Sequence, residues 1–227
     1  MLHTRLPWII IVVLLAISSS AVAEMSEKQI EAWLNNETDV LPGNNINEGK
    51  LHFLKKPPVK PVHHHHNTLI VHNTSLTDGW VKMQQCHEHL DKFPRAQIVY
   101  KKYKIKNLRV ISSQNIQKSW IENHTVQLRN VNKGARICIS ADTRALLKNK
   151  DGSYTLINGP FMRRFLDGFF PMRVSMDLHF PKTLEFVSIY PPQQPGLRLN
   201  FNTTGVHFDA WFEGKLYTRI KLKPAQP

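Results

Sequence analysis

The sequence lacks the short motifs that mark the common classes of enzyme. It contains no G-x-S-x-G nucleophile motif, no H-E-x-x-H zinc motif, no phosphate-binding glycine loop and no dinucleotide-binding fingerprint. Carboxylates such as Asp177 and Asp209 show no spacing that identifies a catalytic pair. We therefore predict a binding protein rather than an enzyme, and we keep a hydrolase acting outside the cytoplasm as a weaker alternative.

Long apolar runs are absent except near the N-terminus. Arg5 precedes an apolar run from Pro7 to Ile17, and small residues at Ala21 and Ala23 follow it. The run is shorter than the roughly 20 residues of a membrane-spanning helix. A positive start, a short apolar core and an A-x-A site are typical of a secretory signal peptide. We expect residues 1–23 to be removed after Ala23, which leaves a periplasmic or secreted chain without a transmembrane segment.

Cysteine is scarce, with Cys86 and Cys138 as the two examples. An even number of cysteines in an exported chain predicts a disulfide bond. The chain-entropy model gives a loop of this size a stabilisation of about 4 kcal/mol. The alternative is that Cys86 is a thiolate metal ligand, but this would leave Cys138 unpaired in an oxidising compartment.

Patterns typical of long helices are also rare, and a period of two dominates from His66 onward. Apolar and polar residues alternate strictly from Met172 to Phe180, which predicts a half-buried strand. The alternating segments 206–212 and 216–222 flank Glu213-Gly214-Lys215 and predict a C-terminal hairpin. Many short strands separated by turn residues favour a mainly β fold, an antiparallel β-sandwich or a barrel-like domain. We assign this single domain to residues 63–227.

Two short helices are predicted beside the strands. Ser26 and Gln29 form a capping-box pattern, so we expect a short helix within residues 24–36. Residues 37–62 are rich in proline and asparagine and are interpreted as an arm or linker. Pro160 and Gly168 bound a segment with apolar residues on one helical face, which predicts a short internal helix.

Histidines cluster at two places in the sequence. Residues i and i+2 of an extended chain point the same way, so His64 with His66, and His87 with His89, have the spacing of chelating pairs. If the strands 68–71 and 80–85 form a hairpin, its open end brings the two clusters together, as a zinc or copper site requires. The alternative is a solvated junction without a metal. The candidate metal ligands are His63, His64, His65, His66, His87 and His89.

Acidic residues are few relative to basic ones, with 17 Asp and Glu against 30 Lys and Arg and a net charge of +13. Outside the cytoplasm, a basic surface favours anionic lipid, polysaccharide or an acidic protein as a partner, and nucleic acid is not expected. Lysines on an edge strand also discourage aggregation, which is the alternative explanation. The predicted interaction surface comprises Lys101, Lys102, Lys104, Lys106, Arg163 and Arg164.

Overall fold

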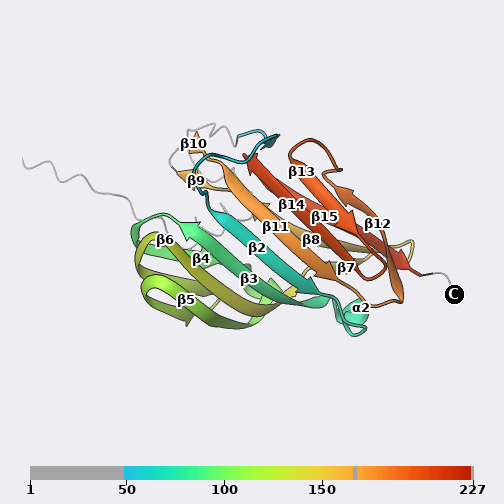
Figure 1. Cartoon of the computed structure of the whole chain (residues 1–227). Helices are drawn as coiled ribbons and strands as arrows, with labels where there is room; N and C mark the ends of the chain where they lie inside the picture. Colours follow the sequence, from blue (N-terminus) through green and yellow to red (C-terminus); the bar gives the residue numbers. More distant parts are fainter. Residues whose placement is uncertain (1–48, 166–167, 226–227) are drawn as a thin grey trace, which may run out of the picture. The chain divides into compact units, whose positions relative to one another are not determined.

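The alternating pattern folds into strands along most of the chain (Figure 1). The computed structural model describes residues 49–165 and 168–225, which belong to one structural unit. The predicted signal peptide, the predicted helix within residues 24–36 and the first part of the predicted arm lie outside the described residues. No helix within the described residues is long and apolar enough to cross a membrane.

A nine-stranded sheet contains the candidate site. Its main strand order is β1-β14-β11-β2-β3-β6-β4, while β13 pairs with β14 and β5 pairs with β6. Neighbouring strands are antiparallel except β2 and β11, which are parallel. The strands are β1 (His52–Phe53), β2 (His64–Ile70), β3 (Trp80–Leu90), β4 (Phe93–Val99), β5 (Ile105–Glu122), β6 (Thr125–Arg144), β11 (Met172–His179), β13 (Leu197–Phe201) and β14 (Gly205–Glu213).

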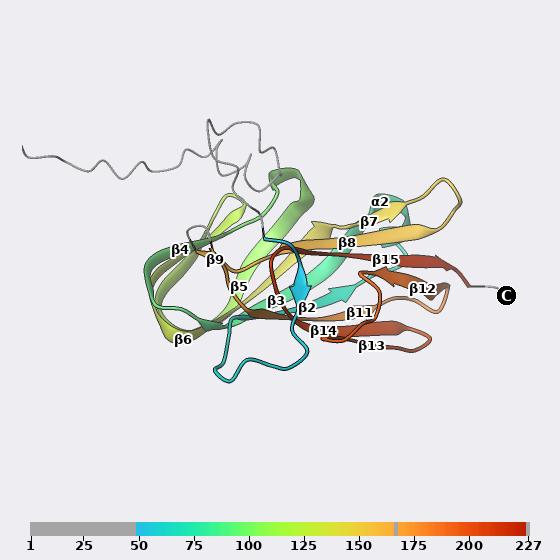
Figure 2. The same cartoon turned by 90° about the horizontal axis from the view of Figure 1, so that it is seen from above.

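A four-stranded sheet packs against one face of the larger sheet (Figure 2). Its order is β12-β15-β8-β7, with β7 (Leu146–Lys148), β8 (Tyr154–Phe161), β12 (Leu184–Tyr190) and β15 (Leu216–Pro224). Leu156 and Ile220 of this sheet share one buried cluster with Met176 and Phe208 of the larger sheet. The prediction of a mainly β sandwich is therefore confirmed, and the described strands do not close into a barrel.

The predicted C-terminal hairpin is wrong. β14 and β15 do not pair with each other, because β14 lies in the nine-stranded sheet and β15 in the four-stranded one. Both strands direct alternate apolar residues, such as Phe212 and Leu216, into the core between the sheets. The turn at Gly214 thus carries the chain across the sandwich. Gly214 has a φ of 89°, and a Cβ there would lie 2.6 Å from the Lys50 carbonyl oxygen.

The internal helix predicted between Pro160 and Gly168 is also wrong. Strand β8 continues to Phe161, which pairs with Leu216 on β15 and is buried in the core. β9 (Arg164–Phe165) and β10 (Gly168–Phe169) then form a two-stranded antiparallel ladder. The sequence around Phe161 fits either a helix or a strand. Pairing with β15 makes it a strand. Helical structure occurs elsewhere in the described chain, at α2 (Ser75–Asp78) and the 3-10 turn η2 (Lys102–Lys104).

The long β5–β6 hairpin is bent by β-bulges. Register shifts lie between Lys106 and Arg109 and between Gln114 and Ile116 on β5. Asn107 and Asn115 occupy these shifts with φ values of 56° and 58°, which asparagine tolerates better than most residues. The bent hairpin encloses a second buried cluster with β4, and this cluster includes Val126, Ile137 and Ile139.

The described part of the predicted arm is attached to the domain. His52 and Phe53 form β1, which pairs with Glu213 and Phe212 at the edge of β14. The Leu54 amide also donates a 2.8 Å hydrogen bond to the Trp211 carbonyl oxygen. The arm therefore adds a short edge strand, His52–Phe53, to the large sheet.

Candidate functional site on the large sheet

Successive histidines of β2 lie on opposite faces of the large sheet. His65 lies on the inner face with Asn67 and Leu69, and all three are buried. His64 and His66 lie on the outer face and are partly exposed. β3 pairs His64 with Glu88, His65 with His87, and His66 with Cys86. The hairpin therefore pairs the two histidine clusters along neighbouring strands. Their side chains nevertheless lie on two opposite faces of the sheet.

The inner-face histidines form a buried polar network. His63 Nε2 lies 3.0 Å from His87 Nδ1, and His87 Nε2 lies 3.2 Å from Gln85 Oε1. His65 Nε2 lies 2.9 Å from Asn67 Oδ1, which also accepts a hydrogen bond from Gln85 Nε2. The two amide oxygens only accept hydrogen bonds, so His87 and His65 both carry their proton on Nε2. His63 then donates through Nε2 to the bare Nδ1 of His87.

The inner histidines are held in the neutral form. Burial, followed by the Arg163 charge, lowers the pKa of His63 to about 4. Burial and the neighbouring His63 lower the pKa of His65 to about 3, and burial lowers the pKa of His87 well below its usual value. Three uncharged imidazoles therefore belong to the interior at neutral pH, where an isolated charge would be costly.

The outer-face histidines share one serine. Ser175 on β11 lies opposite His66 in the parallel β2–β11 ladder. Ser175 Oγ lies 2.7 Å from His66 Nδ1 and also 2.7 Å from His64 Nε2. Ser175 is itself buried, at 4% exposure, between these larger side chains. The parallel ladder thus places one hydroxyl between two imidazole nitrogens.

Carboxylates lie at the far side of both outer imidazoles. Glu88 Oε2 lies 3.3 Å from His64 Nδ1, and Asp177 Oδ2 lies 3.5 Å from His66 Nε2. Asp177 also accepts a 2.6 Å hydrogen bond from His207 Nδ1 on β14. Since carboxylates are acceptors when ionised, the histidine nitrogens that face them carry the protons.

Arg136 fixes the Glu88 carboxylate through a 2.9 Å hydrogen bond from its Nε. Burial alone would raise the pKa of Glu88, but the hydrogen bond from Arg136 and the neighbouring His64 lower it. The pKa of His64 is lowered by burial and then by the Arg173 charge, against the opposing effect of Glu88. Glu88 is thus ionised at neutral pH and faces a largely neutral His64.

The disulfide prediction is confirmed, because Cys86 and Cys138 are bonded. They lie directly opposite each other on β3 and β6, with their Cα atoms 4.1 Å apart. Both sulfurs belong to the outer face, beside His66 in the register. Cys86 is therefore not a thiolate ligand. The disulfide lies next to His66 on the outer face.

The structure does not bring the six predicted metal ligands together. His63, His65 and His87 belong to the inner network, and His64 and His66 to the outer face. His89 is exposed, with a φ of 55° at a register shift, so it does not share a face with His87 as a regular strand would require. Within residues 49–165 and 168–225, no group of three or more His, Cys, Asp and Glu side chains is arranged to hold a metal ion.

The predicted basic residues occupy two separate places. Lys101, Lys102 and Lys104 are exposed around η2, and Lys106 Nζ lies 4.2 Å from the centre of the Trp80 ring at the start of β3. Arg163 instead pairs with Asp91, just beyond the other end of β3, at 2.7 Å. An 11-residue strand spans roughly 30 Å. These residues therefore do not form one continuous basic surface.

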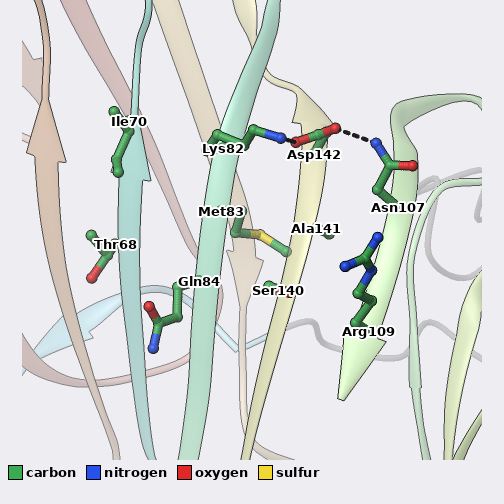
Figure 3. Close-up of a pocket in the computed structure, with 10 residues that line it drawn as sticks. All are labelled: Thr68, Ile70, Lys82, Met83, Gln84, Asn107, Arg109, Ser140, Ala141 and Asp142. Atoms are coloured by element: carbon green, nitrogen blue, oxygen red, sulfur yellow. Dashed lines mark hydrogen bonds and ion pairs between the residues drawn. The ribbon is translucent and has the colours of Figure 1, made fainter. Parts of the chain in front are cut away.

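A cavity of about 430 Å³ opens on the outer face beside His64 and His66, the outer-face histidines of β2 (Figure 3). Strands β2, β3, β5 and β6 contribute its lining. Asp142 accepts hydrogen bonds from Lys82 Nζ at 2.7 Å and from Asn107 Nδ2 at 2.5 Å. The residues lining the cavity are Thr68, Ile70, Lys82, Met83, Gln84, Asn107, Arg109, Ser140, Ala141 and Asp142.

Sequence reasoning missed Ser175, Asp177 and His207 as members of this face. All three lie in the polar phase of strands that were predicted from the alternating pattern. That phase identified them as outward-facing residues, but the pairing of β11 with β2 joins segments more than 100 residues apart. A period of two carries no information about which strands become neighbours.

Comparisons with known proteins do not assign this chain to a family. No family model and no curated protein matches its sequence. Among solved structures, an M1 zinc metallopeptidase E323A mutant from Deinococcus radiodurans bound to a Tyr-Ser-Ala substrate has a TM-score of 0.41 and 12% identity. The M1 zinc metallopeptidase from Deinococcus radiodurans without that mutation has a TM-score of 0.39 and 14% identity. Both matches cover 72% of this chain and 42% of the peptidase chain. A likeness this weak does not transfer peptidase activity or zinc to this protein.

Proposed function

We propose that this protein binds a late transition metal ion, zinc or copper, through His64 and His66 in a compartment outside the cytoplasm. The proposal rests on the Ser175 hydroxyl, which faces two imidazole nitrogens but can donate a hydrogen bond to only one of them. His64 Nε2 and His66 Nδ1 each lie 2.7 Å from its hydroxyl, which has one proton to donate. A metal ion bound by both nitrogen lone pairs would satisfy both imidazoles without an added proton.

The far nitrogens of the two imidazoles support the same proposal. Metal-ligating histidines usually donate their second N–H to a carboxylate, which fixes the tautomer and the ring orientation. Glu88 faces His64 and Asp177 faces His66 in this way, at 3.3 and 3.5 Å. Arg136 in turn orients Glu88. Each candidate ligand therefore has a carboxylate beside its second nitrogen, within hydrogen-bond distance for His64 and at ion-pair distance for His66.

The small number of protein ligands defines the kind of site. Neutral imidazole suits zinc, copper and nickel better than calcium or magnesium. Two imidazoles leave the remaining coordination positions to the Ser175 hydroxyl or to water, whereas structural zinc sites have four protein ligands. We therefore propose an open site for reversible capture or transfer of the metal, rather than a site that holds the fold together.

The first test is metal content and metal affinity of the full exported protein. Untagged protein purified from its native compartment without a nickel column is analysed by elemental mass spectrometry, and chelator-treated protein is titrated with zinc at pH 7.5. We expect one high-affinity equivalent, which the His64→Ala/His66→Ala double variant loses. His72→Ala/His89→Ala is the matched control, since it removes two exposed histidines elsewhere and leaves binding unchanged.

Two results would overturn the metal proposal. If the double variant keeps the zinc affinity of the wild type, the metal is bound elsewhere. If the wild type binds neither zinc nor copper, an additional proton satisfies the imidazole pair instead. Circular dichroism of both double variants separates loss of binding from loss of folding.

A hydrolase is the second candidate, because Ser175, His64 and Glu88 follow the order of a nucleophile, a general base and its orienting carboxylate. Ser175 is only 4% exposed, and its hydroxyl also contacts His66, so we rank this function lower. A fluorophosphonate probe distinguishes the two candidates. In a hydrolase, Ser175 Oγ bonds to phosphorus, fluoride leaves and His64 takes the proton. The metal-binding proposal predicts that Ser175 remains unmodified.

A further inference from the structure

The cavity beside His64 and His66 has an excess of positive charge. Lys82 and Arg109 line it, and Lys106 lies beside it on β5, opposite Asp142 in the register. Asp142 is the one carboxylate in the lining, and both of its oxygens already accept hydrogen bonds, from Lys82 and Asn107. Among the described residues, no carboxylate pairs with the Arg109 guanidinium. Three cationic side chains against one carboxylate therefore leave this region positive, with one guanidinium open to a ligand.

A β-bulge brings Arg109 to the cavity. Lys106 pairs with Asp142 and Arg109 with Ser140, so three steps along β5 oppose two along β6. Asn107 adopts a φ of 56° at this bulge, and the inside–outside phase of β5 shifts by one residue. Leu108 consequently packs against the inner cluster. Asn107 and Arg109 both reach the outer cavity, as Figure 3 shows.

The neutral part of the lining is suited to a hydroxylated ligand. Thr68 and Ser140 offer hydroxyl groups, and Gln84 offers an amide that can both donate and accept. None of these three side chains has a hydrogen-bond partner within the described part of the chain. Ile70, which is 37% exposed, supplies apolar surface to the same cavity. The cavity volume is within the range of small-molecule sites, about 300–1,000 Å³.

The geometry points to a second binding site at this cavity, which takes an acidic saccharide. The carboxylate or sulfate of the sugar would be bound by the Arg109 guanidinium, whose planar fork matches such oxyanions. Thr68, Gln84 and Ser140 would form hydrogen bonds with the ring hydroxyls, and the exposed Ile70 would pack against the ring carbons. This site is separate from the proposed metal ligands and does not depend on metal binding.

The test is calorimetric titration of the full exported protein with an oligoglucuronate in excess chelator. The matched neutral probe is the same oligosaccharide with its carboxyl groups reduced to alcohols. We expect binding of the acidic oligosaccharide, with affinity that falls as salt is added. Arg109→Gln should weaken this binding by about 10-fold or more, as expected for loss of a charge-assisted hydrogen bond. Arg129→Gln is the control, because it removes an equal charge from an exposed position on β6 and should change the affinity by less than about 2-fold.

Each alternative has its own outcome. Equal binding of the acidic and neutral oligosaccharides, or equal weakening by the two arginine variants, would overturn recognition of the acid by Arg109. If inorganic phosphate binds as tightly as the oligosaccharide, the cavity binds anions in general and does not recognise a saccharide. Binding to phosphatidylglycerol vesicles without binding to the oligosaccharide would assign it to a lipid headgroup. The His64→Ala/His66→Ala variant should keep the saccharide affinity, so this proposal and the metal proposal fail independently.

Discussion

Ser175 on β11 lies directly opposite His66 on β2, and its hydroxyl oxygen is 2.7 Å from His66 Nδ1. The contact depends on the parallel β2–β11 pair in an otherwise antiparallel nine-stranded sheet. It joins the histidine run to a strand more than 100 residues away and creates the environment on which the metal proposal rests.

Replacing the carboxylate that faces His64 should weaken metal binding without removing a ligand. We expect Glu88→Gln to reduce zinc affinity by about 10- to 100-fold, since carboxylate partners of ligating histidines contribute by this amount. Glu185→Gln is the matched control, because Glu185 pairs with Lys223 on the four-stranded sheet. Calorimetric titration with zinc measures both. Equal affinity in Glu88→Gln and wild type would show that His64 is not held for a metal by this carboxylate.

Acid should destabilise the fold through the inner histidines. The pKa of His63 is lowered to about 4 by burial, so between pH 6.5 and 4 the unfolded state binds a proton that the folded state does not. Stability therefore falls as the pH falls through this window, and His63 alone accounts for a loss of about 2 kcal/mol between pH 7.5 and 5. His65 and His87 act in the same direction.

Urea unfolding at pH 7.5 and pH 5 measures this effect. His63→Gln should show a smaller loss of stability in acid than wild type, because glutamine does not titrate. The exposed His89→Gln variant is the control and should keep the wild-type pH dependence. A wild-type free energy of unfolding that is equal at the two pH values would contradict burial of three neutral imidazoles.

Removing the disulfide should lower stability and leave metal binding intact. The bond between Cys86 and Cys138 closes a loop with a sequence separation of 52. The chain-entropy model therefore predicts that Cys86→Ala/Cys138→Ala loses about 4 kcal/mol in urea unfolding. Zinc stoichiometry, measured where the variant is still folded, should equal that of wild type. Loss of zinc from the folded variant would make a cysteine part of the metal site.

The crossing between the two sheets should tolerate no side chain at Gly214. Gly214 and Gly152 have φ values of 89° and 79°, so alanine at either position pays the cost of left-handed backbone, roughly 1–2 kcal/mol. A Cβ at Gly214 would also lie 2.6 Å from the Lys50 carbonyl oxygen, whereas a Cβ at Gly152 meets nothing within 4 Å. Thermal unfolding should therefore show a clearly larger loss for Gly214→Ala than for Gly152→Ala. Equal losses would mean that the backbone at Lys50 moves aside.

Strand segments could be predicted well because each carries its own two-residue period. The segment from Met172 to Phe180 matches β11 closely, and its apolar residues are all buried, together with the polar Ser175. The segment between Pro160 and Gly168 was predicted as a helix, because Phe161 and its neighbours fit a helical face as well as a strand. Pairing of β8 with β15 decided between the two, and that contact lies outside the local sequence.

The candidate site was predictable only in part. The i, i+2 spacing of His64 and His66 places them on one face of any strand, and this is the pair that the metal proposal retains. The same rule was applied to His87 and His89, where the register shift on β3 breaks it. The secretory signal and the compartment remain predictions from residues 1–23, which lie outside the described part of the chain.

The sequence by itself determined the mainly β class, the pairing of its two cysteines and the alternation that separates inner from outer residues. These properties follow from local geometry and composition, since neighbouring residues of a strand point to opposite faces and two cysteines allow one intramolecular bond. Only the tertiary structure decided which strands are neighbours. It placed Ser175 between His64 and His66, sent β14 and β15 to different sheets, and carried Arg109 to a cavity beside Lys82. Contacts between distant segments form where their apolar faces are buried together, and no short stretch of sequence specifies its partner.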